Sequence, residues 1–137
     1  MLANGAKLSY SQDGTTYTQL EGLKEIPEQG VDLEKVDNTA LEDSNRHYEL
    51  GIGDLGDTTY GFRWDNTKAT SPYRVARELA ASGKSIHWKE ELKDGSITKF
   101  TGACSVKRTG GSVNGVIDFQ INIAIDSEYT FEDPTTP

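Results

Sequence analysis

The sequence has little cysteine and histidine, and it has no long hydrophobic run. Its single cysteine, Cys104, cannot form a disulfide within the chain, which favours a reducing compartment. The two histidines, His47 and His87, are far apart and neither has a second ligand at metal-binding spacing, so we expect no bound metal. No apolar stretch approaches the ~20 residues of a membrane span, and the opening residues lack the basic and apolar regions of a signal peptide. We therefore expect no membrane insertion.

Basic residues are also few. The chain has 14 lysine and arginine residues against 22 aspartate and glutamate residues, which gives a formal net charge of −8. A nucleic-acid-binding protein needs a basic surface to release counterions from phosphates, so any DNA would be repelled rather than bound. Net negative charge also keeps a protein soluble without any further role. The hydrophobic content of 34% and the mean hydropathy of −0.62 suit thin sheets, or a subunit whose polar faces line an aqueous space.

Catalytic motifs are missing as well. Residues 51–56 match the spacing G-x-G-x-x-G, but a dinucleotide fingerprint opens a helix, and here a strand follows. Glu90 and Glu91 are adjacent in a predicted strand and point to opposite faces, so they cannot act as a carboxylate pair. Cys104 has no neighbouring histidine motif and is expected to be a buried thiol. The sequence therefore predicts no enzyme activity and no cofactor.

One helix is predicted, over residues Pro72–Ser82. Ser71 is a favoured N-cap residue, Pro72 fits the first helical position, and Gly83 supplies the left-handed residue after the last turn. The apolar face of this helix is narrow and consists of Val75, Ala76, Leu79 and Ala80. Because so short a helix is marginal alone in water, we expect it to lie on a sheet.

Alternating hydrophobicity predicts strands elsewhere in the chain. The clearest strand covers residues 116–126, and its expected core face consists of Ile117, Phe119, Ile121, Ile123 and Ile125. The opposite, outward face of this strand carries Asp118, Gln120 and Asn122. Another strand places four residues on one face, namely Thr58, Tyr60, Phe62 and Trp64.

Two Asp-Gly pairs predict hairpin turns. Asp13-Gly14 is expected to form a type I′ turn between two short strands. Asp94-Gly95 is expected to form a two-residue hairpin with Ile97 opposite Leu92, and a bulge near Thr98 would then bring the later apolar residues to the same face.

Together these patterns predict a mainly β protein of about seven strands with a single flanking α-helix. A β-sandwich or barrel is the economical packing for such a set of elements. At 137 residues the chain fits one domain, which we place at residues 1–130, followed by a C-terminal tail at residues 131–137. Residues 22–30 are expected to form a loop. Residues 42–56 are the longest segment without a clear pattern, and loops of that length are usually functional or disordered.

Three stretches of the sequence resemble the tail tube proteins of long-tailed bacteriophages. They are the opening LANGAKLSYSQDGTTYTQLEGLKEIPE, the central SPYRVARELAASGKSIHWKEELKDGSITKFTGACSVK and the final GVIDFQINIAIDSEYTFEDP. Proteins of this family often begin with a short Asp-Gly hairpin followed by Gly-Leu and an EIPE segment. Their single helix typically follows a strand and precedes a hairpin, and the same order of elements is expected over nearly the whole of this chain.

The resemblance implies a fold, an assembly and a location. The implied fold is a compact β-sandwich or barrel flanked by one helix, shared with type VI secretion tube proteins. Copies would form sixfold rings whose sheets join across subunits, and the rings would stack into a hollow tube through which DNA passes. The implied partners are other copies of the chain, the tape-measure protein and the tail-tip or tail-terminator proteins. The implied location is the virion tail, assembled in the host bacterial cytoplasm.

The resemblance also implies which residues make contacts. In this family the long loop between early strands usually reaches a neighbouring subunit or ring, and residues 42–56 would be that loop. Its expected assembly residues are Asp43, Arg46, His47, Tyr48 and Asp54. An acidic channel wall would let DNA slide without adhesion. The residues expected either to line that channel or to be exposed in the ordinary way are Asp118, Gln120 and Asn122.

Two alternative functions stay open at this stage. The tube subunit of a contractile tail or of a secretion system would share the implied fold. A carbohydrate-binding or virion decoration module would instead use Trp64 or Trp88 as an exposed platform on which a sugar ring stacks.

Overall fold

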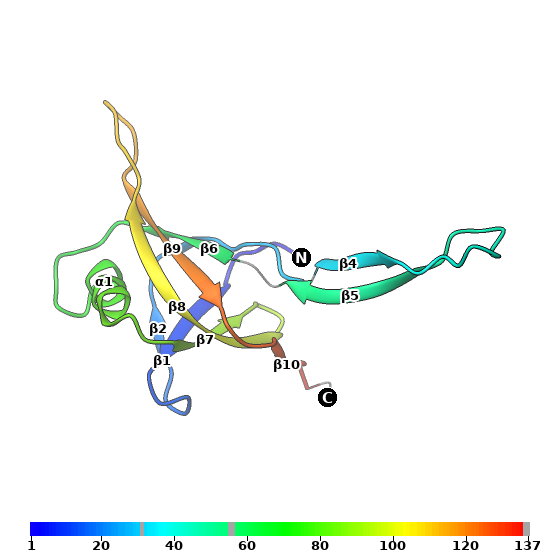
Figure 1. Ribbon diagram of the computed structural model, residues 1–137. Helices are drawn as coiled ribbons and strands as arrows, with labels where there is room; N and C mark the ends of the chain where they lie inside the picture. The colour runs from blue at the N-terminus through cyan, green and yellow to red at the C-terminus, as the bar shows by residue number, and fades with distance from the viewer. Residues whose placement is uncertain (31, 55–56, 136–137) are drawn as a thin grey trace.

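A computed structural model describes residues 1–30, 32–54 and 57–135, with the side chains of all of these except 32–34 and 50–54. Within this part of the chain there are ten strands and one helix (Figure 1). The strands are β1 (Lys7–Ser11), β2 (Thr18–Leu20), β3 (Leu23–Glu25), β4 (Asp32–Asp37), β5 (Tyr48–Asp54), β6 (Asp57–Arg63), β7 (Ile86–Glu91), β8 (Ile97–Arg108), β9 (Asp118–Ile125) and β10 (Thr130–Glu132). The helix is α1 (Pro72–Ser82).

The helix α1 has the predicted bounds, because the residues at both of its ends favour them. Ser71 is extended before the first turn (φ −61°, ψ 143°), and Gly83 is left-handed after the last turn (φ 66°). The Gly83 N–H donates to the Ala80 carbonyl at 3.2 Å. The Ser71 hydroxyl makes no capping hydrogen bond to the helix; it donates to the Asp65 carboxylate at 3.2 Å and accepts from the Lys68 N–H at 2.9 Å.

Eight strands form one antiparallel sheet in the order β2-β1-β7-β8-β9-β6-β3, with β10 paired to β8. The long strand β8 changes partners at Gly102, pairing with β7 before this residue and with β9 after it. The strands at the two ends of the order, β2 and β3, are separated only by Glu21 and Gly22. Because three peptide units span about 11 Å at most, the sheet must curl until its ends approach each other. This curled sheet with one helix confirms the predicted mainly β fold.

The core lies inside the curled sheet and beneath α1. Its buried apolar side chains come from both halves of the sheet and from the helix: Leu8, Leu20, Tyr60, Phe62, Ala76, Leu79, Ile86, Trp88, Phe100, Phe119, Ile121 and Ile123. Phe62 stacks on Phe119 with ring centroids 5.3 Å apart, and Tyr60 lies parallel to Phe100 at 6.5 Å. Since each large apolar side chain contributes about 1.5–3 kcal/mol when it is fully buried, these inner faces hold the two halves of the sheet together.

The hairpin between β7 and β8 differs from the prediction by one residue. Leu92 pairs with Ser96 through its N–H at 2.9 Å, which leaves a three-residue loop in which Gly95 has a φ of 94°. Ile97 therefore lies opposite Glu91, and the predicted pairing of Ile97 with Leu92 is wrong. Because the loop has three residues instead of the predicted two, the later apolar residues of β8 reach the core face without a bulge. The predicted bulge near residue 98 is accordingly absent from the described pairing of β7 with β8.

Alternation along β7 places Glu90 on the inner face of the sheet together with Ile86 and Trp88, and Glu90 is only 4% exposed there. Its carboxylate accepts a hydrogen bond from the Tyr60 hydroxyl at 2.5 Å and another from the Gln29 side-chain amide at 2.6 Å. The Gln29 amide oxygen in turn accepts from the Thr98 hydroxyl at 3.1 Å. Burial raises the pKa of the Glu90 carboxyl, because a charged group loses its hydration there. These contacts fix the segment that leads into β4.

The turn between β1 and β2 also differs from the prediction. The connection runs from residue 12 to residue 17, and Gly14 has a positive φ (81°) while Asp13 does not, so the turn is not of type I′. The Asp13 carboxylate instead accepts hydrogen bonds from the Ser11 hydroxyl at 2.7 Å and from the N–H groups of Thr15 and Thr16 at 2.9 and 3.0 Å. These bonds lower the pKa of Asp13 and shape a longer loop than the Asp-Gly pair predicts.

Three further segments differ from the sequence prediction. Residues 22–30, expected as a loop, contain the short strand β3, which pairs with β6. The strand predicted over residues 116–126 is the shorter β9, and Ile117 is 43% exposed instead of lying in the core. The strand β10 includes Phe131 and Glu132, which lie beyond the expected end of the domain at residue 130.

Candidate assembly surface

The strands β4 and β5 form a separate two-stranded sheet that extends away from the main sheet (Figure 1). We call residues 32–54, which comprise these strands and their connecting loop, the arm. Asp32 pairs with Asp54 at the root of the arm, and Asp37 pairs with Tyr48 near its tip. A hairpin of two strands is only marginally stable by itself in water, so packing against a partner would stabilise the arm.

The long loop predicted at residues 42–56 is therefore correct only in part. Residues 42–47 lie in the loop at the tip, residues 48–54 form β5, and residues 55 and 56 lie outside the described part of the chain. The G-x-G-x-x-G match begins within β5, so it does not form the loop before a helix that a nucleotide site requires. The register of β4 on β5 shifts between Leu33 and Lys35, so a β-bulge or similar irregularity interrupts their pairing there.

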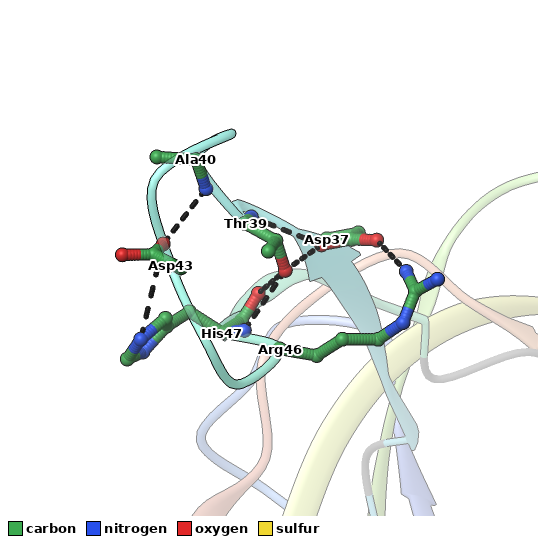
Figure 2. A network of polar contacts seen from close by, with 6 residues as sticks. All are labelled: Asp37, Thr39, Ala40, Asp43, Arg46 and His47. Carbon is green, nitrogen blue, oxygen red and sulfur yellow. Dashed lines mark hydrogen bonds and ion pairs between the residues drawn. The ribbon is translucent and has the colours of Figure 1, made fainter.

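A network of polar contacts shapes the tip of the arm (Figure 2). The Asp37 carboxylate accepts from the Thr39 hydroxyl at 2.6 Å and from the Thr39 N–H at 3.0 Å. The Arg46 guanidinium donates to the other oxygen of the same carboxylate at 2.8 Å. The hydrogen bonds from Thr39, followed by that from Arg46, hold the pKa of Asp37 below its usual value. The last residue of β4 is thereby tied to the returning side of the loop.

A second group of contacts closes the loop at its far end. The Asp43 carboxylate accepts from the Ala40 N–H at 2.8 Å and lies 3.9 Å from the His47 imidazole Nε2 (Figure 2). The His47 N–H donates to the Thr39 hydroxyl at 2.9 Å, and the Asn38 N–H donates to the His47 carbonyl at 2.8 Å. Among the side chains that the structure describes in the arm, polar groups therefore organise this exposed loop, and no cluster of buried apolar side chains lies beneath it.

The structure brings together three of the five predicted assembly residues. Asp43, Arg46 and His47 all belong to the network at the tip. Tyr48 is the first residue of β5 and lies beside them, whereas Asp54 is the last residue of β5 and pairs at the root. At about 3.3 Å per residue, the length of β5 separates Tyr48 from Asp54 by about 20 Å, so these two residues cannot belong to one compact site.

The arm also exposes apolar side chains, and of these the sequence singled out Tyr48 but not Leu41 or Val36. Leu41 at the tip is fully exposed, at 108% of its reference surface. Val36 on β4 and Tyr48 on β5 are 46% and 55% exposed. The sequence feature that could have identified Leu41 is its place as a lone leucine within a polar loop, where the neighbouring residues offer its side chain nothing apolar to pack against. These side chains are left exposed by their own chain and are available for a partner to cover.

The three predicted channel residues lie together in the middle of the main sheet. Asp118, Gln120 and Asn122 occupy alternate positions on the outward face of β9, and all three are half-buried. The strands β6 and β8 flank β9 on its two sides, so this outward face is broad and continuous across three strands.

This face carries basic as well as acidic side chains. The Asp118 carboxylate forms an ion pair with Lys24 at 2.8 Å. Arg63 lies directly opposite Asp118 on β6, and Lys107 lies opposite Gln120 on β8, so both basic residues share its face. Asp118, Gln120 and Asn122 therefore do not form an acidic surface by themselves.

The tryptophans do not form a platform for a sugar ring. Trp88 is fully buried and its indole N–H donates to the Gly102 carbonyl at 3.0 Å. Trp64 is half-buried and packs on Tyr73 with ring centroids 4.3 Å apart. A stacking platform needs an exposed ring face, so the carbohydrate-binding hypothesis loses its basis.

Other chemistry is equally unsupported in residues 1–30, 32–54 and 57–135. No three side chains of His, Cys, Asp or Glu in these ranges are arranged to hold a metal ion. Cys104 is half-buried and packs against the core, and burial raises the pKa of its thiol. The eleven-residue α1, the one helix in these ranges, is too short to span a membrane.

Solved structures share this fold. A chain from the tail of an empty gene transfer agent (GTA) particle, refined with helical C6 symmetry, aligns with a TM-score of 0.73 and 19% identity over 96% of this chain and 98% of that one. A chain from the virion of a native GTA particle aligns with a TM-score of 0.71 and 18% identity, over 96% of this chain and 98% of that one. A chain from the sixfold-symmetrised baseplate of the anti-feeding prophage (AFP) aligns with a TM-score of 0.68 and 5% identity, over 97% of this chain and 95% of that one.

Family membership follows from a comparison of the sequence. No curated protein matches the chain. The family model described as phage tail tube, TTP, lambda-like matches residues 1–131. Because this match covers nearly the whole chain, the protein belongs to the lambda-like family of phage tail tube proteins, which are structural components of the virion tail.

Proposed function

We propose that copies of this tail tube protein form sixfold rings, that the rings stack into a hollow tube, and that the arm joins neighbouring copies. The observation that carries the proposal is the arm, which extends from the main sheet with Leu41 fully exposed at its tip. The sixfold symmetry of the GTA tail and of the AFP baseplate, whose chains share this fold, supports the ring number.

The edges of the main sheet support contacts between copies as well. Within the described ranges, the end strands β2 and β3 each pair with one neighbour, β1 and β6 respectively. Strand edges left open in this way tend to recruit another chain. In a ring, an adjacent copy would cover them, and the sheets of successive subunits would surround a common channel.

The outward face of β9 is the proposed wall of this channel, with Asp118, Gln120 and Asn122 as its central row. The face is polar and carries Lys24, Arg63 and Lys107 beside the central row, with Lys24 ion-paired to Asp118. The net negative charge of the chain as a whole would oppose close binding of phosphates, so few counterions would be released. DNA would then move through the tube without specific binding.

The remaining parts of the proposal concern organisation and partners. Residues 1–130 act as a single domain, which β10 extends by its last two residues, Phe131 and Glu132, and the residues after β10 form a short tail. The tape-measure protein and the tail-tip or tail-terminator proteins are the partners at the lumen and the ends of the tube. Assembly takes place in the host bacterial cytoplasm. The chain has no catalytic role, which the structural nature of its family supports.

The proposal is tested by removing the arm. We expect the purified wild-type chain, concentrated or mixed with tail-tip complexes, to form rings or tubes with a central channel in negative-stain electron micrographs. In a variant that replaces residues 33–53 with a short Gly-Ser linker, we expect the main sheet to keep its core, since none of the arm's described side chains belongs to that core. This variant should unfold like the wild type but form no tubes.

Two results would contradict the proposal. One is a wild-type chain that stays monomeric under all these conditions and never joins tails in infected cells. The other is an armless variant that forms tubes at the same protein concentration as the wild type, which would assign assembly to the sheet edges alone.

A further inference from the structure

Two lysines with the same charge face each other on the outer side of the sheet. Lys89 on β7 lies directly opposite Lys99 on β8, an arrangement that is normally destabilising in an antiparallel pair. The Tyr17 ring lies over both ammonium groups, with its centroid 4.9 Å from the Nζ of Lys89 and 5.7 Å from that of Lys99. The ring attracts the two cations and holds them together. We call Tyr17, Lys89 and Lys99 the cationic patch.

The positive charge of this patch is only partly compensated. Lys99 has Glu132 of β10 at 3.4 Å, but Lys89 has no ion pair among the residues that the structure describes. His87 lies on the same face of β7 as Lys89, and together with Glu128 it borders a hollow beside Lys99. An acidic group from another molecule would therefore relieve the repulsion between the two lysines.

Several basic residues elsewhere are already engaged. Lys24 is paired with Asp118, Arg46 is paired with Asp37, Arg74 is bound to Asn66, and Arg77 lies over the Tyr73 ring. The cationic patch is distinguished from these by two opposed ammonium groups that share one aromatic ring.

The arm carries the complementary charge. Its seven acidic residues are Asp32, Glu34, Asp37, Glu42, Asp43, Glu49 and Asp54, against the two basic residues Lys35 and Arg46. The arm therefore has a formal charge of −5, out of −8 for the whole chain. Glu42 and Glu49 are exposed, and neither takes part in an ion pair within the described ranges.

We propose that the cationic patch of one copy is the docking site for the acidic arm of a second copy. This inference rests on the proposed function, because it names the surface that the arm reaches. The carboxylates near the tip, Glu42 and Glu49, would lie against Lys89 and Lys99, while the Tyr17 ring keeps the lysines in place.

The cationic patch lies on the face of β7 and β8 opposite to the residues that hold the root of the arm. Gln29, just before the arm, is bound to Glu90 and Thr98 on the inner face of the sheet. These two residues are the direct neighbours of Lys89 and Lys99 along β7 and β8. The root of a copy's own arm is therefore held on one face of β7 and β8, and the docking site for a second copy's arm lies on the other face. Such an arrangement would link successive copies through a continuous chain of contacts.

Reciprocal charge reversal tests this docking. In the full chain, we expect K89E/K99E and, separately, E42K/E49K to raise the protein concentration needed for tube formation at least about tenfold, as the loss of one or two effective ion pairs would. The combined variant, E42K/E49K/K89E/K99E, keeps the net charge of the wild type and should restore assembly to near the wild-type concentration. Sedimentation and negative-stain electron microscopy measure the assembled fraction.

The control is K68E/K84E, which makes the same change of net charge at two exposed lysines outside the patch. It should assemble like the wild type, and circular dichroism should show that all variants are folded. The inference is overturned if K89E/K99E assembles normally, if the control is equally impaired, or if the combined variant assembles no better than either double variant. A wild-type chain that forms no tubes would instead refute the proposed function, and this inference with it.

Discussion

The substitution Leu41→Ser tests whether the tip of the arm is covered by another copy. Leu41 is fully exposed in the single chain, so its whole side chain is available for burial on assembly. Burying a leucine side chain is worth about 1.5–3 kcal/mol, and each 1.4 kcal/mol changes an equilibrium constant about tenfold. Replacement by serine should therefore raise the concentration needed for tube formation by a factor of about 10 to about 150.

The assay measures the assembled fraction by sedimentation over a range of protein concentrations. Leu41→Met is the matched control, because it keeps an apolar side chain at the same position and should assemble like the wild type. Both variants should show unchanged urea unfolding as monomers, since a fully exposed side chain contributes nothing to the core. If Leu41→Ser forms tubes at the wild-type concentration, the tip of the arm is not buried between copies.

Further predictions concern the sheet that carries the arm. In Gly102→Ala the added Cβ would lie 2.3 Å from the Ala124 carbonyl oxygen, so the pairing of β8 with β9 must shift at a cost of about 1–3 kcal/mol or more. Gly110→Ala, where nothing lies within 4 Å, should change stability by less than about 1 kcal/mol; urea unfolding followed by tryptophan fluorescence compares the two, and equal stability would contradict the described register. For Glu90, burial raises the pKa of the folded-state carboxyl above its usual value of 4.5, so wild-type stability falls as pH rises through that raised pKa. Glu90→Gln removes this fall, and the unfolding free energy of the variant minus that of the wild type should increase between about pH 4 and about pH 8; a difference that does not change with pH would show that Glu90 is not buried as a titrating group.

The helix and the core strands could be predicted because local sequence decides them. Pro72 and Gly83 fix the ends of α1 through their own backbone preferences. The alternation in β9 places Phe119, Ile121 and Ile123 in the core wherever that strand sits in the sheet. Such features depend on neighbouring residues, so they are readable without the fold.

The hairpin registers could not be predicted with the same success. Both Asp94-Gly95 and Asp13-Gly14 are compatible with several loop lengths, and the choice depends on what the flanking strands bury. At Asp94-Gly95 a three-residue loop allows Trp88 and Phe100 to face the core together, which a two-residue loop would not. The burial of Glu90 follows from alternation along β7, because Glu90 lies on the same face as Ile86 and Trp88.

The arm was the least predictable part of the molecule. Its second strand contains Gly51 and Gly53, which weaken the signal of a strand. The side chains that the structure describes at residues 35–49 are not part of the core of their own chain. The resemblance to tail tube proteins indicated a contact segment at residues 42–56, but not that half of it is a strand. Which copy the arm touches depends on the assembly, and a single sequence does not encode that directly.

A cryo-electron microscopy map of the assembled tube is the most direct test of the claim that the arm joins copies of this protein. We predict sixfold rings in which residues 32–54 of every copy lie against a neighbouring copy, with Leu41 buried and the outward face of β9 toward the channel. A tube in which the arms project into solvent, while other surfaces make all the contacts between copies, would contradict this claim.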